Sequence, residues 1–384
     1  MARSLGGPVD VAVVGAGITG LATALFLRRS GASVAVFEAG PVAIAGSARN
    51  AGVVVPGLNE HYHTLVEALG REVARQWWEF SAAGIAALDG LALEVQEPTW
   101  RRGAAMLLAA NSAELAEMTG SSRELAEDGF EFRLMGAGAA SNYVPVGECE
   151  GASFFSGSAC FEAAGFLRRL AQTFLDGGGS LFDSTPVLEV NAGQAVELLT
   201  QAGTLQAEVV VLAAGAHSLE LVGHRQRELI FPLRGQAFVT APVRQGPRSS
   251  VVAVLANRGH EVYRSTSSQA VVVSGINPGS GPKEKTDQAE VDLIFQQYLE
   301  EVAGRRLSEI ALVEVGQRWA EVHTFSVDGL PLIGSLPGQH KVFVATGFSN
   351  RAWSLGVAAA QALAEQLAGQ SNRLPPGCSP RRFL

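Results

Sequence analysis

The sequence predicts an α/β protein with two parts: a parallel sheet packed between helices, and a second domain that is mostly antiparallel β-structure. A strand, a glycine-rich turn, a helix and a second strand follow one another over residues 10–38. Apolar strands are also expected at 208–214 and 341–345, and a glycine follows closely after each. Between 231 and 318 the pattern changes to short alternating segments, which are typical of an antiparallel sheet.

The first segment, residues 10–38, has the order of a complete βαβ unit. Apolar residues 11–14 predict a buried strand, residues 21–29 have helical spacing, and residues 34–37 predict a second strand. A glycine-rich turn joins the first strand to the helix. This arrangement is that of a Rossmann-like domain that binds a dinucleotide at the end of its first strand.

The turn and the second strand carry the residues that such a ligand requires. Gly15 permits the tight turn, Gly17 lets a pyrophosphate approach the backbone, and Gly20 lets the helix pack closely against the strand. Glu38, at the end of the second strand, is expected to accept the hydroxyls of an adenosine ribose. An acidic residue there favours a ribose without a 2′-phosphate.

The middle of the chain supplies a loop and further elements of both types. Residues 39–52 are rich in small and polar side chains, which let the backbone approach a ligand closely. The expected elements are helices at 62–88, 113–128 and 161–175, strand-like pieces within 91–108, an irregular segment at 130–147, and strands at 180–190 and 195–200.

The second domain and the C-terminal part complete the division of the chain. The expected elements are strands at 236–241, 250–255, 260–265 and 270–276, a helix at 288–302, a strand at 341–345, a turn at Gly347, a helix at 353–367 and a frayed tail at 369–384. We therefore predict a discontinuous cofactor-binding domain, residues 1–90, 146–230 and 319–384. Residues 91–145 and 231–318 are predicted to form a substrate-binding domain.

Composition excludes several classes of partner. The chain of 384 residues has a formal net charge of -8, so no basic face for nucleic acid or anionic lipid is expected. No run approaches the roughly 18 apolar residues of a membrane span, and the N-terminus lacks the apolar core of a leader peptide. The three cysteines have no metal-ligand spacing, so we expect no metal site and a reducing, cytoplasmic location. No oligomeric state is predicted.

Four motifs together resemble the FAD-dependent D-amino acid oxidase family, which includes glycine oxidase, sarcosine oxidase and D-amino acid dehydrogenases. The first is the dinucleotide unit. The others are Ser-Ala-Arg-Asn-Ala-Gly at 47–52, Pro-Leu-Arg-Gly-Gln at 232–236, and Asp-Gly-Leu-Pro-Leu-Ile-Gly at 328–334 followed by Ala-Thr-Gly-Phe at 345–348. We treat Arg234 and Gln236 of the third motif as structural residues.

The resemblance implies that FAD binds in an extended conformation, with the flavin pyrimidine facing the Gly347 turn. The residues expected to bind it are Gly15, Gly17, Ile18, Thr19, Gly20, Glu38, Ser47, Arg49, Asn50, Ala51, Gly52, Val187, Ala214, Gly215, Gly334, Gly347, Phe348 and Ser349. The cofactor is expected to be noncovalent, because Glu321 stands near the position where sarcosine-oxidase-like members carry a flavin-tethering cysteine. Those members also place an oxygen-activating lysine on the strand that corresponds to 270–274, where this chain has none.

The same resemblance implies oxidation of a C–N bond: an amine gives a hydride to flavin N5, and water hydrolyses the resulting imine. Amino-acid-oxidising members grip the substrate carboxylate with an arginine in the motif at 319–329, and here that position is His323. Arg258, Arg264, Arg318 and Arg351 are candidate replacements, and Arg351 is favoured because it follows the Gly347 turn. The candidate substrate-facing residues are His323, Arg351, His260 and Tyr263, each of which has an alternative reading as a packed or solvated residue.

Two other functions remain open from the sequence. A tailoring enzyme of the same fold, acting on a larger biosynthetic intermediate, would explain the missing arginine. A protein that binds a dinucleotide without redox chemistry would bind nucleotide but show no substrate-dependent bleaching of a flavin. A nicotinamide dehydrogenase would leave the residues around Asn50 and Gly347 unexplained.

Overall fold

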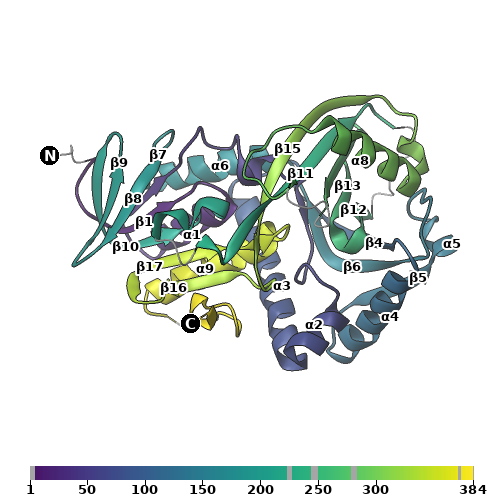
Figure 1. Ribbon diagram of the computed structural model, residues 1–384, viewed down its shortest axis with the longest axis horizontal. Helices are drawn as coiled ribbons and strands as arrows, with labels where there is room; N and C mark the ends of the chain where they lie inside the picture. Colours follow the sequence, from purple (N-terminus) through teal and green to yellow (C-terminus); the bar gives the residue numbers. More distant parts are fainter. Residues whose placement is uncertain (1–4, 223–226, 244–249, 278–282, 371–372, 384) are drawn as a thin grey trace.

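The structure is a computed structural model that describes residues 5–222, 227–243, 250–277, 283–370 and 373–383. Within these ranges the chain forms two sheets that lie side by side, each with its own helices (Figure 1). The four N-terminal residues, part of the segment in which no leader is expected, lie outside the described ranges. No described helix combines the length and the hydropathy that crossing a bilayer requires.

The first sheet contains the predicted parallel strands, in the order β16-β17-β10-β1-β2-β7. From β17 to β7 every neighbouring pair is parallel, while β16 adds an antiparallel edge. Strands β8 and β9 extend β10 as an antiparallel flap. The bounds are β1 (Val9–Val14), β2 (Val34–Phe37), β7 (Ser180–Phe182), β8 (Val187–Ala192), β9 (Val196–Thr200), β10 (Gly203–Leu212), β16 (Leu332–Leu336) and β17 (Gln339–Thr346).

Helices α1 (Ile18–Arg29), α6 (Ala163–Asp176) and α9 (Val357–Leu367) pack beside this sheet, and the long helix α3 (Arg71–Glu94) packs on α9. The helix expected at 353–367 begins as a π-helical turn, η7 (Ala352–Gly356). Gly84 of α3 touches this turn: a Cβ there would lie 1.9 Å from the Ser354 carbonyl oxygen. The absence of a side chain at residue 84 therefore sets how closely α3 approaches α9.

The second sheet is antiparallel except for the pair β4 and β12, and runs in the order β18-β15-β11-β14-β13-β12-β4-β6-β3, with β5 beside β6. The bounds are β3 (Val53–Val54), β4 (Arg101–Ala109), β5 (Phe132–Gly136), β6 (Gly151–Cys160), β11 (Ile230–Thr240), β12 (Val251–Ala256), β13 (Glu261–Ser265), β14 (Val271–Ile276), β15 (Val315–Ser326) and β18 (Phe348–Ser349). Helices α2 (Tyr62–Leu69), α4 (Ser112–Glu127), α5 (Ala137–Ala140) and α8 (Leu293–Arg306) accompany it, as do short turns such as η4 (Asn257–Gly259).

Several predicted boundaries differ from the structure. The helix expected at 62–88 is two helices, because Gly70 has a φ of +83° and ends α2; α3 then continues to Glu94, where strand was expected. The segment 130–147 contains β5 and α5. The predicted domain boundary at 319 falls inside β15, and β3, β6 and β18, which were assigned to the cofactor-binding domain, pair within the second sheet.

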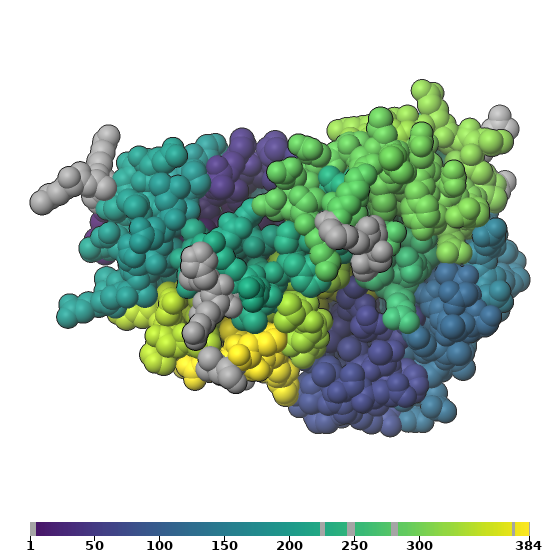
Figure 2. Space-filling model, in the orientation of Figure 1, coloured from purple at the N-terminus to yellow at the C-terminus, as the bar shows by residue number. Residues whose placement is uncertain are grey.

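The C-terminal tail, expected to be frayed, is packed over its described part, residues 373–383. The Arg382 guanidinium pairs with Asp328, and the Trp77 indole Nε1 donates to the Pro376 carbonyl at 3.1 Å. Cys378 is buried. Figure 2 shows this yellow segment lying on the surface of the molecule instead of extending from it.

Candidate active site

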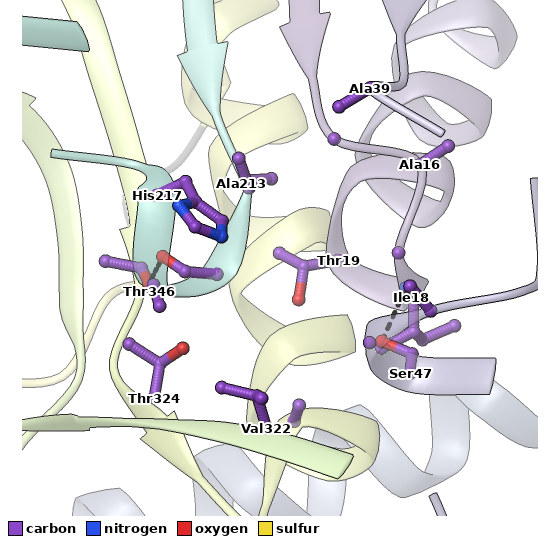
Figure 3. A pocket seen from close by; sticks show the side chains of 18 of the residues that line it. Ala16, Ile18, Thr19, Ala39, Ser47, Ala213, His217, Val322, Thr324 and Thr346 are labelled. Atoms are coloured by element: carbon purple, nitrogen blue, oxygen red, sulfur yellow. Dashed lines mark hydrogen bonds between the residues drawn. The ribbon is translucent and has the colours of Figure 1, made fainter. Parts of the chain in front are cut away.

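A large cavity of about 530 Å³ opens at the carboxyl ends of β1, β10 and β17, and reaches across to β15 of the second sheet. Figure 3 shows its two sides: the glycine turn with Ala16 and Ile18 faces Ala213, His217 and Thr346. We call it the main cavity. Its position at the ends of parallel strands is where α/β sheets bind nucleotides.

The glycine turn builds one wall of the main cavity. A Cβ on Gly15, whose φ is +104°, would lie 2.5 Å from the Ala213 carbonyl oxygen, so only glycine lets β1 and β10 end this close together. Glu38 accepts the Ala16 N–H at 2.7 Å, and the Ser47 hydroxyl accepts the Ile18 N–H at 3.2 Å. These two hydrogen bonds hold the glycine turn at the N-terminus of α1, the place where a pyrophosphate is expected.

The turn at Gly347 builds the opposite end. Gly347 has a φ of +77°, and the neighbouring Thr346 hydroxyl donates to the Gly215 carbonyl at 2.8 Å, which ties this turn to the end of β10. Ser349 also has a positive φ, +53°. Residues 348–349 then pair with β15, so the turn connects the two sheets at the cavity.

Most of the residues predicted to bind the cofactor line the main cavity. They are Gly15, Gly17, Ile18, Thr19, Glu38, Ser47, Arg49, Asn50, Val187, Ala214, Gly215, Gly347, Phe348 and Ser349. Four predicted residues do not line it: Gly20, Ala51, Gly52 and Gly334. A Cβ on Gly20 would lie 1.9 Å from the Gly15 carbonyl and one on Gly52 2.0 Å from the Phe161 carbonyl, so both glycines serve backbone packing.

A second, much smaller cavity of about 20 Å³ adjoins the main one. Asn50, His323 and Asn350 line both cavities, and Arg351 and His260 line the second. Its other walls are largely apolar and come from the second sheet: Ala51, Val53, Leu255, Val262, Ser274 and Ile276. Three of the four predicted substrate-facing residues, His260, His323 and Arg351, therefore line the same cavity. Asn350 was not predicted, although its position between Gly347 and Arg351 could have indicated it.

Arg351 is the cation of the second cavity. Its Nε donates to the Leu58 carbonyl at 3.4 Å, and among the described residues no carboxylate lies within ion-pair distance. Burial lowers the pKa of Arg351 to about 10, so the guanidinium remains charged at neutral pH. A buried charge without a counter-ion is costly unless a ligand supplies one.

The other candidate arginines are already paired. Arg258 contacts Glu60 and Glu117, Arg264 contacts Glu162, and Arg318 contacts Glu300. These pairs leave Arg351 as the candidate that is available to an external carboxylate.

Two hydrogen-bonding atoms in the second cavity also lack protein partners. The buried atoms His260 Nδ1 and Asn350 Oδ1 form no hydrogen bond within the described chain. The Asn350 amide is oriented by its own Nδ2, which donates to the Gly259 carbonyl at 2.8 Å. Burial lowers the pKa of His260 to about 4, and the Arg351, His323 and Arg258 charges act in the same direction, so its ring is neutral.

Tyr263 is placed elsewhere. Its side chain is fully buried in the core of the second sheet, where the hydroxyl donates to Glu261 at 3.0 Å, and it lines neither cavity. Side chains alternate along β13, and the face that carries Tyr263 packs against Val254 and Leu299 in the core. The structure therefore corrects the prediction for this residue.

A model of the DAO family, described as FAD dependent oxidoreductase, matches residues 10–366. The chain belongs to the DAO family of FAD-dependent oxidoreductases. Glycine oxidase of Geobacillus kaustophilus (strain HTA426) is 24% identical over 356 residues, which cover 88% of this chain and 87% of the relative.

Solved structures of a glycine oxidase and an L-proline dehydrogenase share the fold. Glycine oxidase from Geobacillus kaustophilus superposes with a TM-score of 0.82 at 22% identity, over 99% of this chain and 100% of that one. L-proline dehydrogenase from P. horikoshii gives a TM-score of 0.84 at 18% identity, over 99% and 98% of the two chains. The two-sheet architecture is therefore that of this group.

The residues of the main cavity fit the FAD of the DAO family. The glycine turn would hold the pyrophosphate, Glu38 would accept the adenosine ribose, and the Gly347 turn would offer backbone groups to the flavin pyrimidine. Arg49 of the loop donates to the Ala289 and Ala320 carbonyls, so it anchors the second sheet to the cavity wall.

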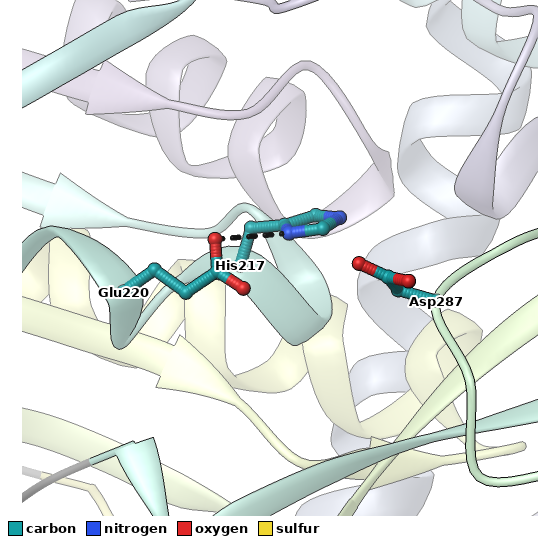
Figure 4. A group of neighbouring side chains, drawn as sticks. All are labelled: His217, Glu220 and Asp287. Atoms are coloured by element: carbon teal, nitrogen blue, oxygen red, sulfur yellow. Dashed lines mark ion pairs between the residues drawn. The ribbon is translucent and has the colours of Figure 1, made fainter.

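One group of possible metal ligands lies on the rim of the main cavity. His217, Glu220 and Asp287 place one ligand atom each within 4.8 Å of one another (Figure 4). All three are exposed, and His217 Nδ1 already pairs with Glu220 at 3.2 Å. We find no second observation among the described residues that indicates an ion, and we describe the group as a surface ion pair with a neighbouring carboxylate.

Proposed function

We propose that the protein oxidises the C–N bond of a small amino acid whose carboxylate is bound by Arg351. The observation that carries the proposal is this half-buried guanidinium, which has no ion pair among the described residues and lies in a cavity that adjoins the FAD site. The amino acids in the names of glycine oxidase and L-proline dehydrogenase support the same substrate class.

The polar atoms of the second cavity match the two ends of an amino acid. Arg351 offers charged N–H donors to a carboxylate, while neutral His260 Nδ1 and Asn350 Oδ1 offer acceptors to an amine N–H. An amine held in this way in its neutral form has a free electron pair with which to form the C=N bond as the carbon loses its hydride. Bound FAD, which we propose is noncovalent, supplies the hydride acceptor.

The lining of the second cavity favours a substrate with a short apolar side chain. Its walls at Val262 and Ile276 are apolar and carry no group that would bind a second charge. The chain itself provides the substrate's orientation, which is the main contribution that a protein makes to hydride transfer.

The test is an anaerobic absorbance titration of the flavin-loaded protein with D- and L-amino acids, sarcosine, N-alkyl glycines and polyamines. We expect bleaching by a small amino acid or N-alkyl glycine, followed by recovery of the oxidised spectrum on admission of air if oxygen is the acceptor. Bleaching by polyamines alone, or by no compound of the panel, would overturn the proposal.

A further inference from the structure

A buried acid and base lie together where β15 reaches both cavities. Glu321 and His323 are 2% and 8% exposed, and His323 Nε2 lies 3.3 Å from Glu321 Oε1. The two residues are two positions apart on a strand, so both side chains project from the same face of the sheet. Glu321 lines the main cavity, and His323 lines both.

A third residue reaches this pair from two strands away. The Ser274 hydroxyl of β14 donates to Glu321 Oε1, although β11 lies between β14 and β15. The crossing is possible because the β11 residue opposite Glu321 is Gly235: a Cβ there would lie 3.2 Å from Glu321 Cγ and 2.8 Å from Ile276 Cγ2. Gly235, the glycine of the motif at 232–236, thus leaves the space through which the Glu321 side chain passes β11 and reaches Ser274.

The other side of the His323 ring faces the turn after Gly347, where a hydrogen bond with the Ser349 backbone favours the protonated ring. Burial acts to lower the pKa of His323, but Glu321 and Ser349 outweigh it, and the pKa is raised above 6.5. The other charged or titratable groups that face the ring are His260 and Arg351 across the second cavity. Neighbouring β14 and β11 contribute uncharged Ser274 and Leu233.

We propose that Glu321 is a positioning residue, which with Ser274 and Gly235 fixes the His323 ring between the two cavities and sets the charge that this ring presents to a bound carboxylate. Arg351 holds the carboxylate in the proposed function, on which this inference rests. His323 does not replace the family's arginine as a direct partner, because its Nε2 is already engaged by Glu321.

The charge of the site then depends on pH in a defined direction. When His323 is protonated, its charge adds to that of Arg351 in the site. As the pH rises through the pKa of His323, the ring loses its proton, so the net charge of the site falls by one. A carboxylate ligand is then held on the order of tenfold more weakly. His260, with a pKa of about 4, and Arg351, with a pKa of about 10, change little between about pH 6 and pH 9.

The experiment uses the flavin-loaded protein and acetate, a carboxylate that carries no amine to oxidise. Acetate affinity is measured from the perturbation of flavin absorbance at a series of pH values, and the His323 ring is titrated by NMR with labelled histidine. In the native protein we expect acetate affinity to fall with the midpoint of the His323 titration, above pH 6.5. In Glu321→Gln the ring should titrate at lower pH, and acetate affinity should be independent of pH above about pH 7.

Three further variants make the result specific. Ser274→Ala removes one hydrogen bond of Glu321 and should shift the ring titration in the same direction by less, and Gly235→Ala should disturb the pair by filling the crossing space. Glu300→Gln is the matched control, since it removes a carboxylate that pairs with Arg318, another β15 residue, and lines neither cavity. A His323 titration that is unchanged in Glu321→Gln would overturn the inference.

The outcomes also separate this inference from the proposed function. The NMR titration needs no substrate, so it measures the effect of Glu321 on the His323 ring even if no amino acid bleaches the flavin. Conversely, bleaching by an amino acid with an unchanged ring titration in Glu321→Gln would support the proposed function and reject the role of Glu321.

Discussion

At the scale of single residues, the proposed substrate site has its cation on the turn after Gly347, at Arg351. His323, which occupies the position where the resemblance implies a carboxylate-binding arginine, is engaged by Glu321. From the sequence, Arg351 is favoured as the carboxylate-binding residue only because it follows the Gly347 turn. The structure adds that three other candidate arginines are neutralised by carboxylates.

Replacing Arg351 by Met should weaken binding of a carboxylate substrate or of acetate roughly 10- to 100-fold, because a charge-assisted hydrogen bond is lost. The rate of bleaching at saturating substrate should fall less than the affinity. Arg351→Lys should recover part of the loss. The control is Arg318→Met, which removes a half-buried cation of β15 that lines neither cavity; an equal loss there, or none in Arg351→Met, would argue against the assignment. Anaerobic titrations give both quantities.

Residues close in sequence could be placed from the sequence, whereas the second cavity could not. The glycine turn and Glu38 belong to one βαβ unit, whose local spacing fixes their arrangement. His260, His323 and Arg351 come from three segments that only sheet pairing brings together. The prediction for Tyr263 was wrong because neighbouring side chains of β13 point to opposite faces of the sheet. The sequence of a strand does not reveal which of its faces packs in the core and which faces the cavity.

At the scale of elements, the parallel strands β1, β10 and β17 were predicted correctly because each ends in an apolar run that a glycine follows closely. Strand β6 was missed because it is built from small residues and serine around one Phe pair, with neither a helical nor an alternating pattern. The close packing of α3 against α9 could not be predicted from the sequence either. A glycine inside a helix more often marks a place where the helix is less stable than a place where another helix packs closely.

Gly84→Ala should therefore destabilise the protein by about 1–3 kcal/mol, because the added methyl group overlaps the Ser354 carbonyl and forces the two helices apart. Gly90→Ala, in the same helix, is a matched control: no atom lies within 4 Å of its Cβ position. The control should be neutral or up to about 1 kcal/mol more stable, owing to helix propensity. Chemical denaturation of both variants measures the difference, and similar effects for the two would contradict the packing argument.

At the scale of the whole molecule, the C-terminal segment binds to two distant parts of the chain, residues 328–333 and helix α3. Arg382 pairs with Asp328 and donates to the Pro331 and Leu330 carbonyls, Ile333 donates its N–H to Cys378, and Pro376 accepts from Trp77. Its composition resembled that of a disordered tail, and these partners lie too far away in sequence to be inferred.

Arg382→Met should lower the free energy of unfolding by about 1–2 kcal/mol near neutral pH, since Asp328 is partly exposed and the pair is partly screened. Burial alone raises the pKa of Asp328, but Arg382 outweighs it and the pKa is below 3.8. The ion pair therefore contributes fully above pH 3.8 and is lost as the pH falls through the lower folded value. Unfolding curves at several pH values test this. Arg381→Met, whose side chain forms no ion pair among the described residues, should leave stability unchanged.

The strand order of the first sheet has a consequence for the protein's synthesis on the ribosome. The edge of β1 that pairs with β10 stays unsatisfied until residues 203–212 have emerged, and β10 waits in turn for residues 339–346. Two apolar strand edges are thus unpaired while the segments between these strands are made, which is a state prone to aggregation. Because the main cavity includes the Gly347 turn, the nascent chain cannot complete its cofactor site before residue 347 has been made. Capture of the cofactor therefore has to wait until the glycine turn after β1 and the Gly347 turn after β17 have come together in the first sheet.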